Sequence, residues 1–464
     1  MRLLKTETSD KWMVFHVNLT QGRRPIDGAR PGRPGRRAGT PGRPGDDRRA
    51  ARCQGRGDSR RAVGHRVSRT DRGRVGKGLT TRSAKVGPTR RLPPGATPLR
   101  HSGGYYRRNP SFATVVGSDP GHPPAASPPV PPPLPPDRPV RWGILATGQI
   151  SALLVDEIRR TPDCEVVAVG SRSEEAARRF AAAHGVATAH GSYDALIEND
   201  EVDVVYVGAS HNAHYAAVRH CVEVGRAVLC EKPLTVDASQ TEELVRLARA
   251  ADVFFMEAMW MRCRPGFAEL SRVLASGEIG EVRQLRAALG FAVTEEHSTR
   301  FFDPNQAGGA LLDVGVYPVT LAFAALGPPG EVRALGHVRE GVDRSVVVAM
   351  SWPSGATALL AGCLEAEIDT SAVFAGTRGR VEITAPFHEI GALRVVGENR
   401  PARRVVPPAE GLGYVHEIAE VVRCLRSGLG ESPLVPLDES IAIMRILDEC
   451  RRQIGLTYPE AAYR

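Results

Sequence analysis

Short runs of apolar residues alternate with helical patterns between residues 140 and 256. The apolar runs contain few polar residues, which is typical of strands buried on both faces, and they alternate with helical segments of about 10–15 residues. This alternation predicts a parallel sheet with helices on both sides, the doubly wound Rossmann arrangement of an α/β domain, over residues 138–258. We expect strands at 140–146, 164–169, 202–208, 227–230 and 253–256, and helices at 149–160, 174–184, 213–224 and 237–250.

A different pattern begins at residue 259. A helix at 266–276 leads into a strand at 282–293, and a Gly308-Gly309 turn opens a helix at 311–325. Strands joined by glycine and proline turns then predict an α+β domain with an open, mostly antiparallel sheet over residues 259–464. We expect those strands at 331–338, 345–351, 356–363 and 368–375, and two late helices at 415–427 and 439–454.

Residues 1–137 show neither periodicity. They are rich in Arg, Gly and Pro, repeat Pro-Gly-Arg-Pro-Gly at 31–35 and 41–45, and end in a proline run at 128–136. Such a segment cannot bury enough apolar surface to offset its ordering entropy, so we predict a disordered extension. It is either a basic tail that could bind nucleic acid or, as we favour, the product of a start site assigned too far upstream.

Charge divides the chain at the same point. Residues 1–137 hold 28 Lys and Arg against 9 Asp and Glu, whereas the whole chain has a net charge of +9. The remainder is therefore net acidic, which argues against a nucleic-acid surface outside the extension. The eight cysteines form no C-x-x-C pair or zinc-type cluster, so we expect no metal site and a reducing cytoplasm. With no run of about 18 apolar residues, we expect no membrane span.

The loop after the first predicted strand carries a partial dinucleotide fingerprint. It reads Ala146-Thr147-Gly148-Gln149-Ile150-Ser151, and of the three glycines in G-x-G-x-x-G only the second is kept. At Gly148 the backbone would approach a pyrophosphate, and the N–H groups of the helix beginning near Gln149 would bind it. A glycine helix start with no ligand is the alternative. The place of the loop in a doubly wound domain favours the cofactor.

The turn after the second predicted strand favours NADP over NAD. It reads Gly170-Ser171-Arg172-Ser173 and lacks the acidic residue that usually holds the ribose hydroxyls of NAD. Ser171 and Arg172 could instead hold the 2′-phosphate of NADP. The alternative is that Arg172 is simply an exposed arginine at a helix start. The missing acid is the stronger argument, because it removes the repulsion that would exclude a phosphate.

Two further segments place reactive side chains where ligands sit in such folds. Glu231-Lys232-Pro233 ends a strand at the carboxyl edge of the sheet, so Lys232 would project toward a nicotinamide. Asp313 and Tyr317 are four residues apart and would share one face of the helix at 311–325. A solvated lysine or a chance acid–tyrosine pair could explain either segment alone. Together they indicate catalysis.

These segments resemble the glucose-fructose oxidoreductase, inositol dehydrogenase and MocA (Gfo/Idh/MocA) family, and within it most closely the dihydrodiol dehydrogenase and NADP-dependent xylose dehydrogenase group. The resemblance covers roughly residues 141–458. Tyr317 stands where much of the wider family has histidine, and the dihydrodiol group uses tyrosine. The departures are Ala146, Ser151, and Ser210 in place of a common proline. The matching motifs are Trp142-Gly143-Ile144, Glu231-Lys232-Pro233, Phe255-Met256-Glu257-Ala258-Met259-Trp260, and residues 308–318, 376–379 and 413–417.

The resemblance implies a role for each site residue. Tyr317 would be the acid/base, and because an unperturbed phenol titrates near about pH 10, Lys232 would lower its pKa or hydrogen-bond the substrate oxygen. Asp313 would orient Lys232 or a substrate hydroxyl. Glu231 would contact the cofactor, Ser210, His211 and His214 would line the nicotinamide pocket, and Glu257 and Trp260 would border the substrate. For His211 and Trp260 a structural role is the favoured alternative.

The sequence therefore predicts an enzyme that transfers a hydride between NADP, or less favourably NAD, and a hydroxyl-bearing carbon of a sugar or cyclic diol. One alternative is the same fold acting on inositol-like polyols or another small molecule. Another is an NADP-binding sensor without catalysis. A sensor could lose Lys232 or Tyr317 without penalty, so the presence of both favours an enzyme. The open sheet and the resemblance imply a homodimer or homotetramer.

Overall fold

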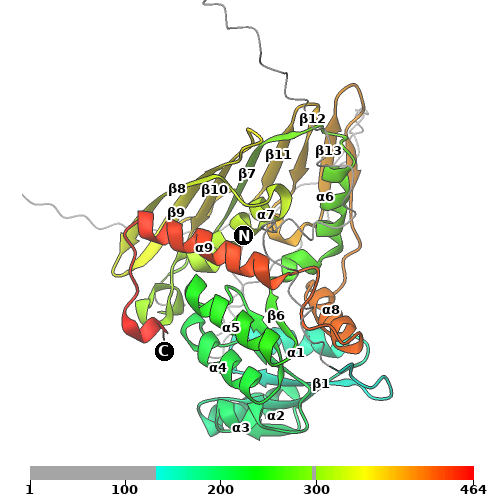
Figure 1. Cartoon of the computed structure of the whole chain (residues 1–464), viewed down its shortest axis with the longest axis vertical. Coiled ribbons are helices and arrows are strands. Elements are labelled where there is room, and N and C mark those ends of the chain that lie inside the picture. Colours follow the sequence, from blue (N-terminus) through cyan, green and yellow to red (C-terminus); the bar gives the residue numbers. More distant parts are fainter. Residues whose placement is uncertain (1–131, 295–298, 464) are drawn as a thin grey trace, which may run out of the picture. The chain divides into compact units, whose positions relative to one another are not determined.

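The computed structural model of the chain describes residues 132–294 and 299–463, which belong to one unit with two sheets (Figure 1). Residues 1–131 of the predicted disordered extension lie outside the described residues. Both predicted sheet types are present, so the predicted fold class is confirmed.

The first sheet has six strands, all parallel, in the order β3-β2-β1-β4-β5-β6. Val204 and Tyr206 of β4 pack into the core cluster that includes α1 and α2, whereas Val205 and Val207 pack into the cluster that includes α3, α4 and α5. Alternate side chains thus bury both faces, which is why the strand is apolar throughout. The elements are β1 Val140–Leu145, α1 Gln149–Arg160, β2 Cys164–Gly170, α2 Glu174–His184, β3 Thr188–His190, α3 Tyr193–Ile197, β4 Val204–Val207, α4 His211–Glu223, β5 Ala227–Glu231, α5 Ala238–Ala250 and β6 Phe255–Ala258.

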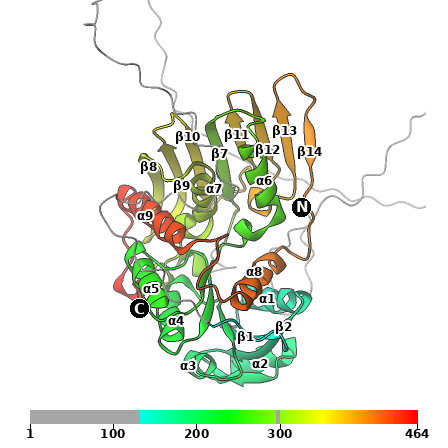
Figure 2. The ribbon, with the colours of Figure 1, turned by 45° about the vertical axis from the view of Figure 1, so that its right-hand side comes forward.

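The second sheet has eight strands in the order β14-β13-β12-β11-β7-β10-β9-β8. Among the strands that the structure describes in this sheet, the β7–β10 pair alone is parallel, and helices α6, α7 and α9 lie on one face (Figure 2). In β9, Val346, Val348 and Met350 are buried while Val347 is exposed, so one face packs against these helices. The elements are α6 Pro265–Ala275, β7 Val282–Gly290, α7 Val316–Leu326, β8 Glu331–Arg339, β9 Val342–Ser351, β10 Thr357–Cys363, β11 Ala372–Gly376, β12 Gly379–Ile383, β13 Leu393–Gly397, β14 Arg403–Val405, α8 Val415–Arg426 and α9 Leu437–Gln453.

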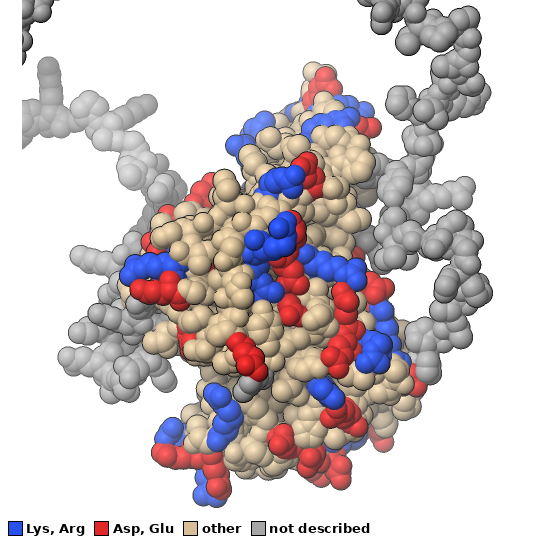
Figure 3. Space-filling view, turned by 60° about the vertical axis from the view of Figure 1, so that its left-hand side comes forward, with Lys and Arg blue, Asp and Glu red and all other residues tan. Residues whose placement is uncertain are grey.

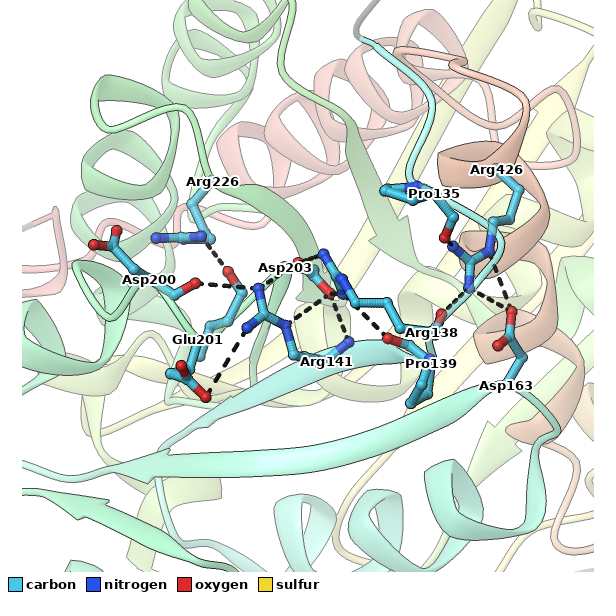
Figure 4. A network of polar contacts seen from close by, with 11 residues as sticks. Pro135, Arg138, Pro139, Arg141, Asp163, Asp200, Glu201, Asp203, Arg226 and Arg426 are labelled. Atoms are coloured by element: carbon cyan, nitrogen blue, oxygen red, sulfur yellow. Dashed lines mark hydrogen bonds and ion pairs between the residues drawn. The ribbon is translucent and has the colours of Figure 1, made fainter.

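A network of arginines fixes the segment that leads into β1 (Figure 4). Asp203, next to β4, accepts hydrogen bonds from Arg138 at 2.5 Å and from the Arg141 side chain at 3.0 Å. Burial opposes the charge on Asp203, but these bonds outweigh it and lower its pKa to about 2. Arg426 of α8 binds Asp163 at 2.6 Å and the backbone carbonyls of Pro135 and Arg138. These contacts therefore fix the segment before β1 to the start of β4 and to α8.

One stretch, residues 304–326, is long and apolar enough to cross a membrane, with a mean hydropathy of 1.7. In the structure 89% of its most apolar window is buried inside the fold. It contains α7, which packs against β7 and β10. Its composition is therefore that of a core helix.

The structure contains short elements that the apolar pattern does not predict. β3 and α3 separate β2 from β4, and β12, β13 and β14 extend the second sheet beyond β11. β3 has three residues, none of them buried, and β12 carries Arg380 and Glu382. Short, half-exposed strands have too few buried positions to show a hydrophobic period.

Candidate active site

The loop after β1 keeps the backbone course of a dinucleotide-binding turn. Ala146, at the position of the first fingerprint glycine, has a φ of 83°, which normally favours glycine. Gly148 caps α1, and a Cβ there would meet nothing within 4 Å, so the helix N-terminus is open to a ligand. Thr147 and Ile150 are half-buried around it, and Gln149 is exposed.

The third fingerprint position is compensated from the neighbouring strand. Ser151 replaces the glycine that allows close helix–strand packing, and it is fully buried. Directly after β4 stands Gly208, where a Cβ would lie 2.7 Å from the Ser151 Oγ. A glycine on the strand side therefore makes room for the serine on the helix side.

The turn after β2 presents a positive side chain and no carboxylate. Ser171 is buried, its N–H donates to the His190 carbonyl at 3.1 Å, and Arg172 is exposed. Burial raises the pKa of Tyr193, while the charge and hydrogen bond of Arg172 oppose that shift, so the guanidinium lies at the start of α3. Arg172 and the beginning of α3 therefore lie side by side at the carboxyl end of β2.

The beginning of α4 is held by two buried histidines. Ser210 caps this helix, and its hydroxyl donates to Asn212 at 2.7 Å. His211 Nδ1 lies 3.0 Å from the Ala307 carbonyl. Both ring nitrogens of His214 lie 3.1 Å from backbone carbonyls, those of Pro233 and Ala209. Burial lowers the pKa of His211 to about 3 and that of His214 to about 4, so both are neutral at pH 7.

Lys232 follows β5 and reaches the helix that carries Asp313. Its ammonium donates to the backbone carbonyl of Asp313 at 2.8 Å and lies 4.8 Å from the centre of the Tyr317 ring. Burial lowers the pKa of Lys232, although Asp313 and Glu231 oppose the shift.

The Asp313 side chain has other partners than the sequence predicted. Leu311–Gly315 form a π-helical turn before α7, so Asp313 and Tyr317 are not related by one regular α-helical step. Its Oδ1 lies 3.0 Å from Arg300 Nη2 and 3.7 Å from His211 Nε2. Burial acts to raise the pKa of Asp313, but Arg300, His211 and Lys232 outweigh it and lower the pKa. The backbone carbonyl of Asp313 thus holds the Lys232 ammonium, while the Asp313 carboxylate binds Arg300.

Tyr317 is buried, and its hydroxyl accepts a hydrogen bond from Trp260 Nε1 at 2.8 Å. Burial, reinforced by the charge of Glu231, raises the pKa of Tyr317 well above its usual value, against the opposing effect of the Trp260 bond. We expected Lys232 to lower that pKa. The ammonium instead lies over the ring face, and desolvation dominates. In this state the phenol therefore remains protonated across the physiological range.

The two glutamates have their oxygens engaged within the fold. Glu231 accepts hydrogen bonds from the Tyr206 hydroxyl at 2.7 Å and from the Lys232 N–H at 3.2 Å. Glu257, expected beside the substrate, accepts from Leu234 N at 3.1 Å and from Ser440 Oγ at 2.6 Å. These contacts tie β6 to the loop after Lys232 and to α9, so they indicate a structural role for Glu257.

Trp260 belongs to a group of aromatic side chains around Tyr317. It stacks on Tyr414 with ring centres 4.7 Å apart and meets the edge of His388 at 5.6 Å, and His388 also lies 5.2 Å from Tyr317. The sequence alone assigned no role to His388, Tyr414 or Arg300. Tyr414 lies in the 413–417 motif of the family resemblance, whereas His388 and Arg300 lie in no motif that would indicate a functional role. In the part of the chain that the structure describes, no group of three His, Cys, Asp or Glu could hold a metal.

Comparisons with known proteins agree with this geometry. Residues 140–259 match the model of an oxidoreductase family with an NAD-binding Rossmann fold, and residues 267–382 match the GFO/IDH/MocA C-terminal domain. Trans-1,2-dihydrobenzene-1,2-diol dehydrogenase of Bos taurus is 38% identical over 334 residues, which are 69% of this chain and 98% of that protein. The Homo sapiens enzyme of the same name is 37% identical over 331 residues, with the same coverage.

Solved structures show the same arrangement. A 3-ketoreductase from Actinomadura kijaniata, in complex with NADP and TDP-benzene, is 28% identical with a TM-score of 0.62, covering 68% of this chain and 98% of that one. An aldose-aldose oxidoreductase from Caulobacter crescentus shares the fold at 21% identity and a TM-score of 0.62, with the same coverage. The chain therefore belongs to the Gfo/Idh/MocA family, on the side of the dihydrodiol dehydrogenases, and is an NAD(P)-dependent dehydrogenase.

Proposed function

We propose that Lys232 and Tyr317 carry out the proton chemistry of this dehydrogenase, and one observation carries the proposal. The Tyr317 hydroxyl accepts from Trp260, and among the described residues its own O–H has no acceptor. The proton is therefore available to a substrate oxygen. A nicotinamide nucleotide, which the open N-terminus of α1 fits, supplies or accepts the hydride.

Each side chain then has a defined task. In the reducing direction Tyr317 gives its proton to the carbonyl oxygen. The oxidising direction is the reverse, and the phenol must first lose its proton to solvent before it can take the alcohol proton. The Lys232 ammonium, held by the Asp313 carbonyl, hydrogen-bonds the substrate oxygen and stabilises the negative charge that develops on it. The aromatic side chains of Trp260, Tyr414 and His388 offer apolar surface beside Tyr317, which suits the carbon faces of a sugar or cyclic diol.

We propose NADP rather than NAD as the cofactor, because Arg172 supplies a cation and residues 170–173 supply no carboxylate. In a fluorescence titration of the full chain, Arg172→Ser should weaken NADPH binding by about 10- to 100-fold, the value of about 1.5–3 kcal/mol for a charge-assisted hydrogen bond. NADH binding should hardly change. Arg178→Ser, which removes an exposed arginine of α2 paired with Glu174, is the matched control. Equal losses for NADPH and NADH would contradict the assignment.

The same protein should be screened for NADP reduction on pentoses, hexoses, inositols and cyclic diols. Turnover on sugars or diols supports the proposed substrate, and turnover confined to inositols supports the polyol alternative. A sensor would bind NADPH and turn over none of them. The presence of both Lys232 and Tyr317 beside each other weighs against that reading.

We propose that two copies associate through the uncovered face of the eight-stranded sheet. Leu335, Val347 and Leu359 are 75%, 52% and 54% exposed. Leu335 pairs with Val347 across β8 and β9, and Leu359 pairs with Ala349 across β9 and β10, so all of them share one face. A contiguous exposed apolar group of this kind is typical of an interface.

Light scattering during size-exclusion chromatography tests this association. The full chain should elute as a dimer or tetramer, and Leu335→Arg should shift it toward a monomer, since a buried charge without a partner is costly. Leu412→Arg, at an exposed loop leucine outside the sheet, should leave the mass unchanged. A monomeric natural chain would reject the interface.

We further propose a cytoplasmic protein whose described part does not bind nucleic acid. All seven described cysteines are free thiols, as a reducing compartment allows. On the face drawn in Figure 3, basic and acidic residues are interspersed, so no large single-sign field forms there. Nucleic-acid binding by the extension, residues 1–137, stays a prediction, and residues 1–131 of it lie outside the described residues.

A further inference from the structure

A buried carboxyl on the second sheet holds the beginning of the helix that carries the catalytic residues. Asp343 lies on β9 and is fully buried. Its Oδ2 accepts the backbone N–H of Leu311 at 2.7 Å. Leu311 is the first residue of the π turn that contains Asp313. The contact therefore joins two segments 32 residues apart at the point where the catalytic helix starts.

The turn before that helix is shaped around the same carboxyl. Gly309 has a φ of +130°, and a Cβ at this position would lie 2.1 Å from Asp343 Oδ1. The neighbouring carbonyl, that of Gly308, accepts a hydrogen bond from the buried Tyr458 hydroxyl at 2.7 Å. The two glycines are thus fixed from one side by Asp343 and from the other by Tyr458, and a side chain at Gly309 would collide with the carboxyl.

The charge on Asp343 is set by opposing effects. The free N–H groups of a helix start favour a carboxylate, whereas complete burial disfavours it. Burial is the larger effect and raises the pKa of Asp343 to about 7, helped by Asp313 and opposed by the Leu311 N–H and by Arg451. The other titratable groups that face it are Cys450 on α9 and Tyr458. Its neighbour Arg344 pairs with Glu340 at 3.0 Å.

We propose that Asp343 is a positioning residue for hydride transfer, which rests on the function proposed above for Lys232 and Tyr317. Asp343 touches neither of them. It fixes Leu311 and thereby the π turn, whose Asp313 carbonyl holds Lys232 and whose continuation carries Tyr317. Reacting groups displaced by about 1 Å lose about 10²-fold in rate, so a small movement of this turn has a large effect on catalysis.

The test compares Asp343→Ala and Asp343→Asn in the full chain. Asp343→Ala should lower kcat between about 10- and 100-fold while the Kd for NADPH stays within about twofold, because the cofactor loop lies on the other sheet. Asp343→Asn keeps an acceptor oxygen of the same reach and should recover kcat to within about threefold. Asp237→Ala removes an acceptor of the same kind, bonded to Gln240 N at 2.9 Å at the start of α5, and should leave kcat unchanged.

Hydrogen exchange measured by mass spectrometry gives a readout that needs no turnover. Asp343→Ala should increase exchange in residues 309–317, and Asp237→Ala only at the start of α5. If Asp343→Ala speeds exchange at residues 309–317 but the natural chain turns over no substrate, the contact between Asp343 and Leu311 is supported and the proposed function is refuted. If Asp343→Ala leaves exchange at residues 309–317 unchanged, or keeps a kcat within about twofold of that of the natural chain, the positioning role is overturned.

The pH dependence separates positioning from a purely structural role. Because the folded-state pKa lies above the ordinary value of about 3.9, stability should fall as pH rises toward about 7. The ionised carboxylate binds Leu311 N–H more strongly, so kcat should rise over the range in which the melting temperature falls. Asp343→Asn should remove both trends. If kcat and melting temperature fall together in the natural chain, the residue acts on stability alone.

Discussion

Tyr317→Phe should lower kcat by about 10²- to 10⁴-fold, the usual contribution of a positioned acid/base. The substitution removes only the hydroxyl, whose proton has no acceptor among the described residues and is the one that we assign to the substrate oxygen. Because the pKa of Tyr317 is raised by burial, the phenol is a proton donor over the whole physiological range. Steady-state kinetics in the carbonyl-reducing direction measure the effect.

The Phe variant also leaves the Trp260 N–H without its acceptor, which costs about 1–3 kcal/mol of stability. A thermal melt and an NADPH titration separate this cost from lost chemistry. Tyr215→Phe is the matched control, since the Tyr215 hydroxyl donates to Glu243 at 2.8 Å on the surface of α4 and α5. A Phe variant of Tyr317 that keeps a tenth or more of the natural kcat would reject Tyr317 as the acid/base.

Lys232→Met should reduce kcat/KM by about 10²- to 10³-fold, as expected when a donor aimed at a developing negative charge is removed. Methionine has a similar length but cannot bind the Asp313 carbonyl or the substrate oxygen. NADPH binding should be largely retained, because the cofactor loop and Arg172 are untouched. Loss of NADPH binding with an unchanged rate at saturation would show that Lys232 binds the cofactor rather than the reacting oxygen.

The pH profile gives a second test of Lys232. Burial lowers its pKa, and the charged form performs the proposed task, so activity should fall as pH rises through that lowered pKa. Lys232→Arg stays charged at any pH that the protein tolerates, so any residual activity should lack this alkaline limb. Lys232 is also the only lysine after Lys85, so ¹³C-methylation of amines followed by NMR can titrate it directly. If NMR gives Lys232 the pKa of an ordinary lysine, the predicted fall of activity with rising pH is contradicted.

The main strands and helices could be predicted because burial imposes a pattern on them. Val204–Val207 are apolar at every position since both faces of β4 are covered. In β9, Val346, Val347 and Val348 form a run of β-branched residues that predicts a strand, although only the structure shows that Val347 is on the exposed face. The sequence did not predict β12 to β14, because these strands are stabilised by pairing with neighbouring strands and by surface contacts such as that of Arg394 with Glu382 at 2.8 Å. Such pairing leaves no local apolar period.

The positions of the reactive groups could also be predicted from the sequence, whereas their contacts and pKa shifts could not. Lys232 stands at a strand end, and Asp313 and Tyr317 are close in sequence, so local rules bring them near the cofactor. The contacts of Arg300 with Asp313 and of Asp343 with Leu311 join distant segments, and their residues look ordinary where they stand. The direction of the Tyr317 pKa depends on burial by the whole fold, which no short motif contains.

The bond between Lys232 and the Asp313 carbonyl has an evolutionary consequence. Every residue type has a main-chain carbonyl, so mutation at position 313 can change the charge beside the site without releasing the lysine. The codon at position 313 can therefore drift with no intermediate in which the ammonium is left unheld, whereas the codon of Lys232 cannot, because the proposed chemistry needs the ammonium itself.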